Sequence, residues 1–174
     1  MKTLYKTGLA FMAAMALLTS CSDDDGGSTG DGGNVPATGT YINAKVDGQT
    51  FETLSIQGMT TAAASKTGSG DQTYIVISAA SQNTDSMVIT LVGVTGEGTF
   101  ELGPESQTFV AFTEGTTDTF HSSADCNGVT GEIKVTHYSE EKIEGTFEFV
   151  GGDEECTGTK NVTNGKFRGE YVQR

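Results

Sequence analysis

The sequence predicts an all-β protein, either an antiparallel, meander-rich β-sandwich or an up-and-down β-barrel of about ten strands. Short stretches of alternating apolar and polar residues run through it from residue 40 onward. Turn formers, many of them among the 24 glycines, separate these stretches about every 8–12 residues. No stretch in this part has a convincing helical period, so strands joined by short turns are the expected architecture.

The first expected pair of strands is the clearest local signal. Residues 41–46 alternate, with Ile42, Ala44 and Val46 on one face, and residues 49–54 follow after Asp47-Gly48. An Asp-Gly pair between short strands predicts a type I′ hairpin, because both central residues of that turn need a positive φ. Residues 55–66 are ambiguous; their Gly and Thr content favours an extended segment over a helix starting at residue 62.

The middle of the chain predicts a run of further strands. Residues 86–94 are apolar on both faces, which indicates a position inside the sheet. The other expected strands in this part span residues 72–80, 99–102, 108–112 and 118–121. Most neighbours look joined by hairpins, so a meander is favoured over a Greek key.

The last third predicts a long hairpin and a final strand. Residues 131–138 and 142–149 alternate in matching fashion, so residue numbers paired across the hairpin should sum to about 280. The final run, residues 159–172, contains Asn164-Gly165, which is either a turn or a glycine bulge in one long strand. We favour the bulge, with Phe167 and Tyr171 packed inward.

The first twenty residues have the pattern of a secretory signal peptide. Lys2 and Lys6 precede an unbroken apolar run, residues 9–18, which is about half of the ~20 residues needed to span a bilayer. Small residues then precede Cys21. Residues 1–20 are therefore expected to be removed on export.

Leu18-Thr19-Ser20-Cys21 resembles the lipobox of bacterial lipoproteins. The resemblance implies a diacylglyceryl thioether on Cys21, cleavage before it and acylation, for example with palmitate, of the new amino terminus. Ser22, Asp23, Asp24 and Asp25 follow directly and resemble the acidic export signal of Bacteroidota outer-membrane lipoproteins. That likeness implies an outer-membrane protein that is anchored by lipid and faces the cell exterior.

The mature chain divides into a tether and one domain. Residues 21–39 carry the lipidated cysteine and a Gly- and Asp-rich linker, which would reach roughly 20–25 Å as a flexible coil. Residues 40–174 are long enough for a single all-β domain. Residues 43–51, 142–149 and 162–167 resemble a group of Bacteroidota lipoproteins of unknown function, which supports the fold and transfers no activity.

Two cysteines remain in the domain. An exported chain meets an oxidising compartment, which favours a Cys126–Cys156 disulfide over free thiols. The register of the long hairpin places Cys126 opposite residue 154, close to Cys156. The bridge is thus expected to pin the open end of that hairpin.

The charge of the chain limits its partners. All 23 acidic residues but only eight of the ten Lys and Arg residues follow Cys21, so the net charge falls from −13 to −15 after cleavage. Nucleic acid and anionic membrane surfaces require clustered basic residues, which are missing here. We expect no nucleic-acid partner.

No motif predicts catalysis, a metal or a cofactor. His121 lies near Ser122, Ser123, Asp125 and Cys126, but closeness in sequence does not make a catalytic set. His137 reads as a packed strand residue. The two histidines and two cysteines lack zinc-ligand spacing, and residues 153–155 read as solvated acidic charge rather than a calcium loop.

The remaining expectation is a binding or accessory module without catalysis, for a glycan or another outer-membrane protein. Glycan sites usually use aromatic platforms; the chain has no Trp, which leaves Tyr41, Tyr74, Tyr138 and Tyr171. Asp85-Ser86-Met87 resembles a Bacteroidota O-glycosylation acceptor, with Ser86 modified. The alternatives are a structural envelope lipoprotein with no small ligand and, third, a hydrolase.

Overall fold

The computed structural model describes residues 38–171, which form an all-β fold, as predicted. Residues 70–72 form a single 3₁₀ turn, η1. Within the described range there are 13 strands: β1 (Tyr41–Val46), β2 (Gln49–Glu52), β3 (Ser55–Ile56), β4 (Met59–Thr60), β5 (Ala63–Thr67), β6 (Tyr74–Ala80), β7 (Ser86–Val92), β8 (Gly98–Leu102), β9 (Phe109–Glu114), β10 (Asp118–His121), β11 (Thr130–Tyr138), β12 (Lys142–Gly152) and β13 (Thr159–Glu170). The sequence predicted about ten strands. The additional ones are β3, β4 and β5, which form in the segment that the sequence left ambiguous.

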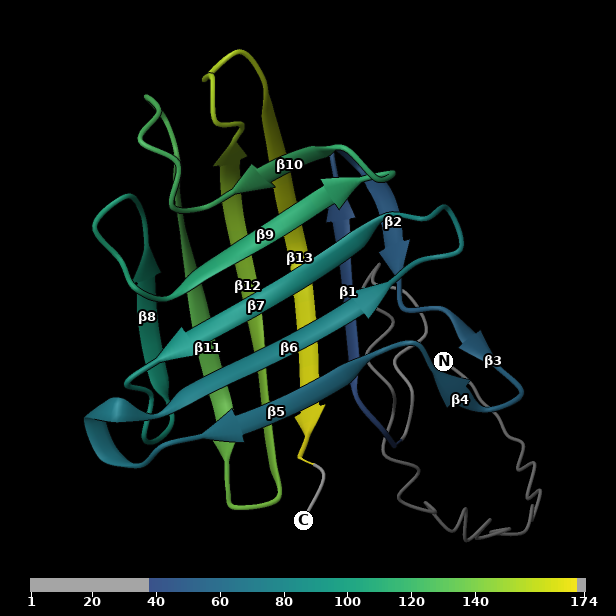
Figure 1. Cartoon of the computed structure of the whole chain (residues 1–174), viewed down its shortest axis with the longest axis vertical. Helices are drawn as coiled ribbons and strands as arrows, with labels where there is room; N and C mark the ends of the chain where they lie inside the picture. The colour runs from purple at the N-terminus through teal and green to yellow at the C-terminus, as the bar shows by residue number, and fades with distance from the viewer. Residues whose placement is uncertain (1–37, 172–174) are drawn as a thin grey trace, which may run out of the picture.

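Eleven of these strands form one antiparallel sheet curled into a half-barrel (Figure 1). Strands β5, β6, β7, β9 and β10 make a front layer that runs diagonally across the view. Strands β1, β2, β8, β11, β12 and β13 make a rear layer whose main strands run close to vertical. The sheet thus has the two facing layers of a sandwich, but it is one continuous sheet.

The connectivity is mostly a meander, as predicted. Strands β5, β6 and β7 pair in sequence order, and so do β11, β12 and β13. Strand β8 is the exception, because it leaves the front layer and pairs with β11 at the edge of the rear layer. The first and last long strands, β1 and β13, lie side by side.

The core lies between the two layers and is built from alternating residues. Phe51 of β2 meets Phe112 of β9 edge-on, with ring centroids 6.2 Å apart, so even the outermost rear strand contacts the front layer. The fully buried side chains come from both layers: Ile75, Ile77, Met87, Ile89, Leu91 and Val110 from the front, and Ile42, Ile133, Ile143, Val162 and Phe167 from the rear. Their period of two is what the sequence alternation predicted.

Two turn predictions are resolved. Asp47 and Gly48 have φ values of 50° and 80°, which confirms the type I′ hairpin between β1 and β2. Asn164-Gly165 is a bulge inside β13, because the register slips beside it against both β1 and β12. Asn164 has a φ of 53° there, and a side chain on Gly165 would run into the Phe147 ring.

One corner joins the two layers through the backbone. Strand β12 pairs with β13 along its length and with β11 up to Val150. At Gly152 its partner becomes His121 of β10, a front-layer strand. A Cβ on Gly151 would lie 2.8 Å from the Phe149 ring and 3.2 Å from the backbone of β10, so this crossing requires glycine.

At the opposite edge of the sheet, the front and rear layers contact each other through side chains and not through a backbone ladder. Strand β5 ends the sheet and has only β6 as a backbone partner within the described residues. Its Ala64 packs over Gly169 of β13, and its Lys66 ammonium lies 4.8 Å from the centroid of the Tyr138 ring and 5.6 Å from that of Tyr171. The missing ladder at this edge is why the fold is a half-barrel.

The anchor and export predictions lie outside the described residues. Cys21 and the acidic run Ser22, Asp23, Asp24 and Asp25 fall within residues 1–37, so they stay predictions. Among residues 38–171, no helix has the length and hydropathy to cross a bilayer.

We predict that Gly151→Ala destabilises the fold by about 1–3 kcal/mol, because the Phe149 ring and the β10 backbone both have to shift to admit the methyl group. Urea denaturation measures the loss. Gly103→Ala is the matched control, since a Cβ at Gly103 meets nothing within 4 Å. Equal midpoints for the two variants would show that the corner tolerates a side chain.

Candidate functional site

Three loops lie at the same end of the half-barrel, which we call the disulfide end (Figure 1). They are residues 115–117 between β9 and β10, residues 122–129 between β10 and β11, and residues 153–158 between β12 and β13. The Cys126–Cys156 disulfide joins the second loop to the third, with an S–S distance of 2.02 Å and a Cα–Cα distance of 5.5 Å. This confirms the predicted pairing.

The predicted hairpin register accounts for the bridge. Gly131 pairs with Phe149 and Val135 with Gly145, and both pairs of numbers sum to the expected value. Continuing that register beyond the strands brings the two cysteine-bearing loops together. The disulfide therefore pins the mouth of the hairpin, as the spacing indicated.

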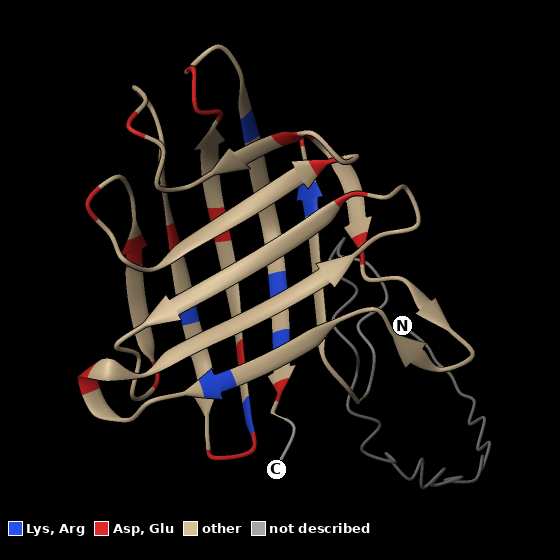
Figure 2. Cartoon of the chain, viewed as in Figure 1, with Lys and Arg blue, Asp and Glu red and all other residues tan. Residues whose placement is uncertain are grey.

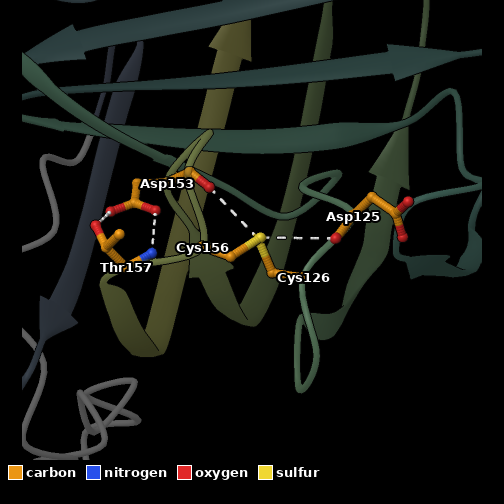
Figure 3. Close-up of a disulfide and its surroundings, with 5 residues drawn as sticks. All are labelled: Asp125, Cys126, Asp153, Cys156 and Thr157. Atoms are coloured by element: carbon orange, nitrogen blue, oxygen red, sulfur yellow. Dashed lines mark hydrogen bonds between the residues drawn. A yellow bond between two sulfur atoms is a disulfide. The ribbon is translucent and has the colours of Figure 1, made fainter.

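The loop that carries Cys156 is held in shape by Asp153 (Figure 3). The Asp153 carboxylate accepts a 2.8 Å hydrogen bond from the Thr157 backbone N–H and a 2.7 Å bond from the Thr157 hydroxyl. Both bonds lower the pKa of Asp153 from its usual value, and the bond from the Thr157 hydroxyl has the larger effect. The lowered pKa favours the ionised carboxylate. In the same loop, the Cys156 backbone N–H donates a 3.2 Å hydrogen bond to the Asp153 carbonyl oxygen, and Cys156 has a φ of 55°.

An open pocket of about 610 Å³ lies beside this loop. Its lining combines acidic and hydroxyl side chains with one imidazole: Thr117, Asp118, Thr119, Phe120, His121, Asp153, Glu154, Glu155 and Thr157. Four of these side chains are carboxylates and none belongs to Lys or Arg. The acidic residues are visible on the loops at this end in Figure 2.

Lys160, a basic side chain at this end of the domain, is already engaged in ion pairs. The Lys160 ammonium lies 2.9 Å from a Glu114 carboxylate oxygen and 3.5 Å from one of Asp47, and it sits over the Phe120 ring. The hydrogen bond to Glu114 is the main reason that the pKa of Lys160 is raised. Lys160 therefore ties β13 to β9 and to the first hairpin turn rather than neutralising the pocket.

The residues near His121 in the sequence do not assemble into a catalytic triad. His121 Nδ1 and the Ser123 hydroxyl are 3.1 Å apart. Ser122 is fully buried, and its Oγ accepts a hydrogen bond from the Val110 backbone N–H. Cys126 is in the disulfide and has no thiol to act as a nucleophile.

The other sequence-based candidates are scattered. His137 lies in β11, paired with Glu144 and half-buried. Among residues 38–171, no group of three or more His, Cys, Asp or Glu side chains is arranged to hold a metal ion. Residues 153–155 line the pocket described above.

Ser86 is the first residue of β7 and is partly exposed. It lies between Ala80 and Thr113 in the sheet, at the start of the strand that the sequence predicts from residue 86. The neighbouring Asp85 carboxylate accepts a 2.8 Å hydrogen bond from the Gly115 backbone N–H. Glycosylation of Ser86 stays a prediction.

The four candidate tyrosine platforms differ in exposure. Tyr74 is 45% exposed and Tyr41 is buried. Tyr138 and Tyr171 are partly buried against the core, and Lys66 lies near both rings. Of these four, only Tyr74 presents its ring openly to solvent.

Sequence reasoning missed most of the pocket. Asp118 and Thr117 lie more than thirty residues from Glu154 and Glu155 along the chain. The one sequence signal for part of the pocket was the predicted disulfide, since Cys156 directly follows Asp153-Glu154-Glu155. The bridge placed those carboxylates at the hairpin mouth, but nothing in the sequence placed β10 beside them.

Comparison with known proteins adds one finding. The family model described as "Domain of unknown function (DUF6252)" matches residues 38–169. No curated protein and no solved structure matches the chain.

We predict that replacing both cysteines of the bridge, Cys126→Ser with Cys156→Ser, lowers the free energy of unfolding by about 3–4 kcal/mol, given the loop closed by a sequence separation of 30 residues. Urea denaturation under non-reducing conditions measures this loss. Reductant should lower the stability of the wild type and leave the double variant unchanged. Two free thiols in the unreduced domain would contradict the bridge.

Proposed function

The chain belongs to this family of unknown function, DUF6252, and from that premise we propose that it is a lipid-anchored binding module, without catalysis, displayed on the outer face of the outer membrane. The disulfide end is its binding end. The ligand is a partner protein that presents basic side chains to the acidic pocket. The single observation that carries the proposal is the position of that pocket relative to the tether.

The tether joins the domain at the end opposite the pocket. The Gly39 backbone N–H donates a 2.9 Å hydrogen bond to the Glu170 carboxylate, and the Glu170 backbone N–H donates a 3.0 Å bond to the Thr40 hydroxyl. Strand β13 runs from there back to Thr159 beside the pocket loop. At ~3.3 Å per residue its length is roughly 35 Å, so a chain anchored through residue 21 would hold the pocket away from the membrane.

The chemistry of the pocket favours a positively charged partner. Asp118, Asp153, Glu154 and Glu155 line it with no basic side chain to balance them. Clefts lined by one sign of charge concentrate ligands of the opposite sign. The strongly negative chain adds to this field and discourages acidic ligands.

A glycan is the less favoured ligand. Carboxylates and threonine hydroxyls can bond to sugar hydroxyls, but ring stacking needs an exposed aromatic face. Phe120 in the pocket is 8% exposed, and Tyr74 lies outside the pocket lining.

The non-catalytic part of the proposal is supported by the state of two nucleophile candidates. The Cys126 thiol is consumed in the bridge, and the Ser122 hydroxyl is buried in a backbone hydrogen bond. The Ser123 hydroxyl, 3.1 Å from His121 Nδ1, is the candidate that a hydrolase would have to use. A structural envelope lipoprotein is the runner-up, and the acidic pocket at the far end is what favours a binding role over it.

We predict that neutralising the pocket with Asp118→Asn, Glu154→Gln and Glu155→Gln weakens the binding of an oligolysine peptide about tenfold, because each exposed pair contributes ~0.5 kcal/mol. Calorimetry at fixed salt measures the affinity. The matched control is Glu97→Gln, Glu101→Gln and Glu105→Gln, which removes three exposed charges outside the pocket lining. An equal loss in both triple variants would assign the attraction to net charge, and selective retention of neutral oligosaccharides would favour the glycan.

We predict that Cys21→Ser abolishes palmitate labelling and releases the protein from the membrane fraction, because the acyl chains on that one cysteine supply the stable part of the anchor. Asp23→Ala, Asp24→Ala and Asp25→Ala together should keep the lipid but reduce antibody labelling of intact cells. Asp31→Ala, in the same tether but away from Cys21, is the control and should leave labelling intact. Undiminished surface staining of the triple variant would defeat the export assignment.

A further inference from the structure

We propose that the β3–β4 hairpin is a second membrane contact, whose apolar tip enters the bilayer surface beside the lipid anchor. This inference rests on the proposed anchoring through Cys21 and adds to it a surface of the folded domain. The hairpin is the two-stranded sheet that stands apart from the half-barrel (Figure 1).

The tip of the hairpin exposes two large apolar side chains. Ile56 and Met59 are directly paired across it and are 55% and 72% exposed. The turn between them, Gln57-Gly58, has φ values of 53° and 82°, as in a tight type I′ turn. The turn therefore presents both side chains together at the outermost point of the hairpin.

This apolar pair lies in a long uncharged stretch of a strongly acidic chain. Residues 53–65 contain no Asp, Glu, Lys, Arg or His, and the hairpin is free of charged residues in Figure 2. Burying a charge in an apolar medium is costly, so an uncharged corner is the part of this domain suited to approach a bilayer. The turn between β11 and β12, which carries Glu140 and Glu141, lies well apart from it in the same view.

The base of the hairpin is fixed at the point where the tether joins the domain. The Thr60 hydroxyl donates a 2.9 Å hydrogen bond to the Thr40 carbonyl oxygen, one residue before β1. The Leu54 backbone N–H and the Thr61 hydroxyl each donate a 2.8 Å bond to the Ala80 carbonyl oxygen. A rigid base beside residue 40 holds the apolar tip close to the tether.

The length of the tether permits the contact. The linker expected from the sequence, residues 21–39, would reach roughly 20–25 Å from the anchored cysteine. An interfacial side chain needs to sink only ~5–10 Å into the headgroup and acyl boundary. The acidic disulfide end, about a strand length away, would then face outward.

The test uses the absence of Trp from the natural chain. The full lipidated protein carrying Met59→Trp is reconstituted in phosphatidylcholine vesicles, with and without lipid brominated near the top of the acyl chains. We expect Trp fluorescence to fall about twofold in the brominated vesicles, because the side chain would lie at the depth of interfacial anchors. Adding Ile56→Ser to this variant should reduce the quenching.

Asn127→Trp is the matched control, because Asn127 is exposed in the loop that carries Cys126 at the disulfide end; it should show no quenching. If the protein floats with the vesicles and neither Trp is quenched, the hairpin contact is overturned while the lipid anchor stands. If Trp at residue 59 shifts only in native outer membranes and not in pure lipid, the tip binds a protein and the inference is overturned. If the lipidated protein does not float at all, the proposed anchoring itself fails.

Discussion

The fold depends on the crossing at Gly151 and Gly152, where one strand serves both layers. Strand β12 pairs with β13 and β11 in the rear layer and then, at Gly152, with His121 of the front layer. A Cβ on Gly151 would crowd the backbone of β10, and a Cβ on Gly152 would crowd the Cys126 and Val129 side chains, so both positions favour glycine. Cys126 and Cys156 bridge the loops next to this crossing, so the covalent link lies beside the point where the two layers join.

That constraint also creates the two different ends of the domain. At the disulfide end, the crossing brings β10 beside the loop of residues 153–158 and gathers four carboxylates around one pocket. At the other end, Thr40 and Glu170 bring the start of the domain next to the end of β13, and the β3–β4 hairpin is fixed to the same place. An acidic end and an uncharged corner near residue 40 are consistent with the proposed attachment to a membrane through the N-terminal segment.

Much of the architecture could be predicted, because its signals lie within single strands, turns or one hairpin. Alternation identified the strands, Asp47-Gly48 fixed the first turn, and the register of the long hairpin placed Cys126 opposite residue 154, close to Cys156. The His121 neighbourhood shows where such reasoning stops. Ser122 and Ser123 are adjacent in the chain, yet one hydroxyl bonds to the β9 backbone and the other lies beside the imidazole.

The sequence by itself determined the strand pattern, the disulfide and the acidity of the domain, because each depends on residue type, short-range spacing or one hairpin register. It left Asn164-Gly165 open between a turn and a bulge, and the pairing of β13 with β1 and β12 decided for the bulge. Only the tertiary structure decided that a single sheet curls into a half-barrel, that β8 pairs with β11, and that Asp118 joins Glu154 and Glu155 around a pocket. These arrangements depend on contacts between segments distant in the chain. Such contacts are selected by how the whole core packs, and no local pattern encodes them.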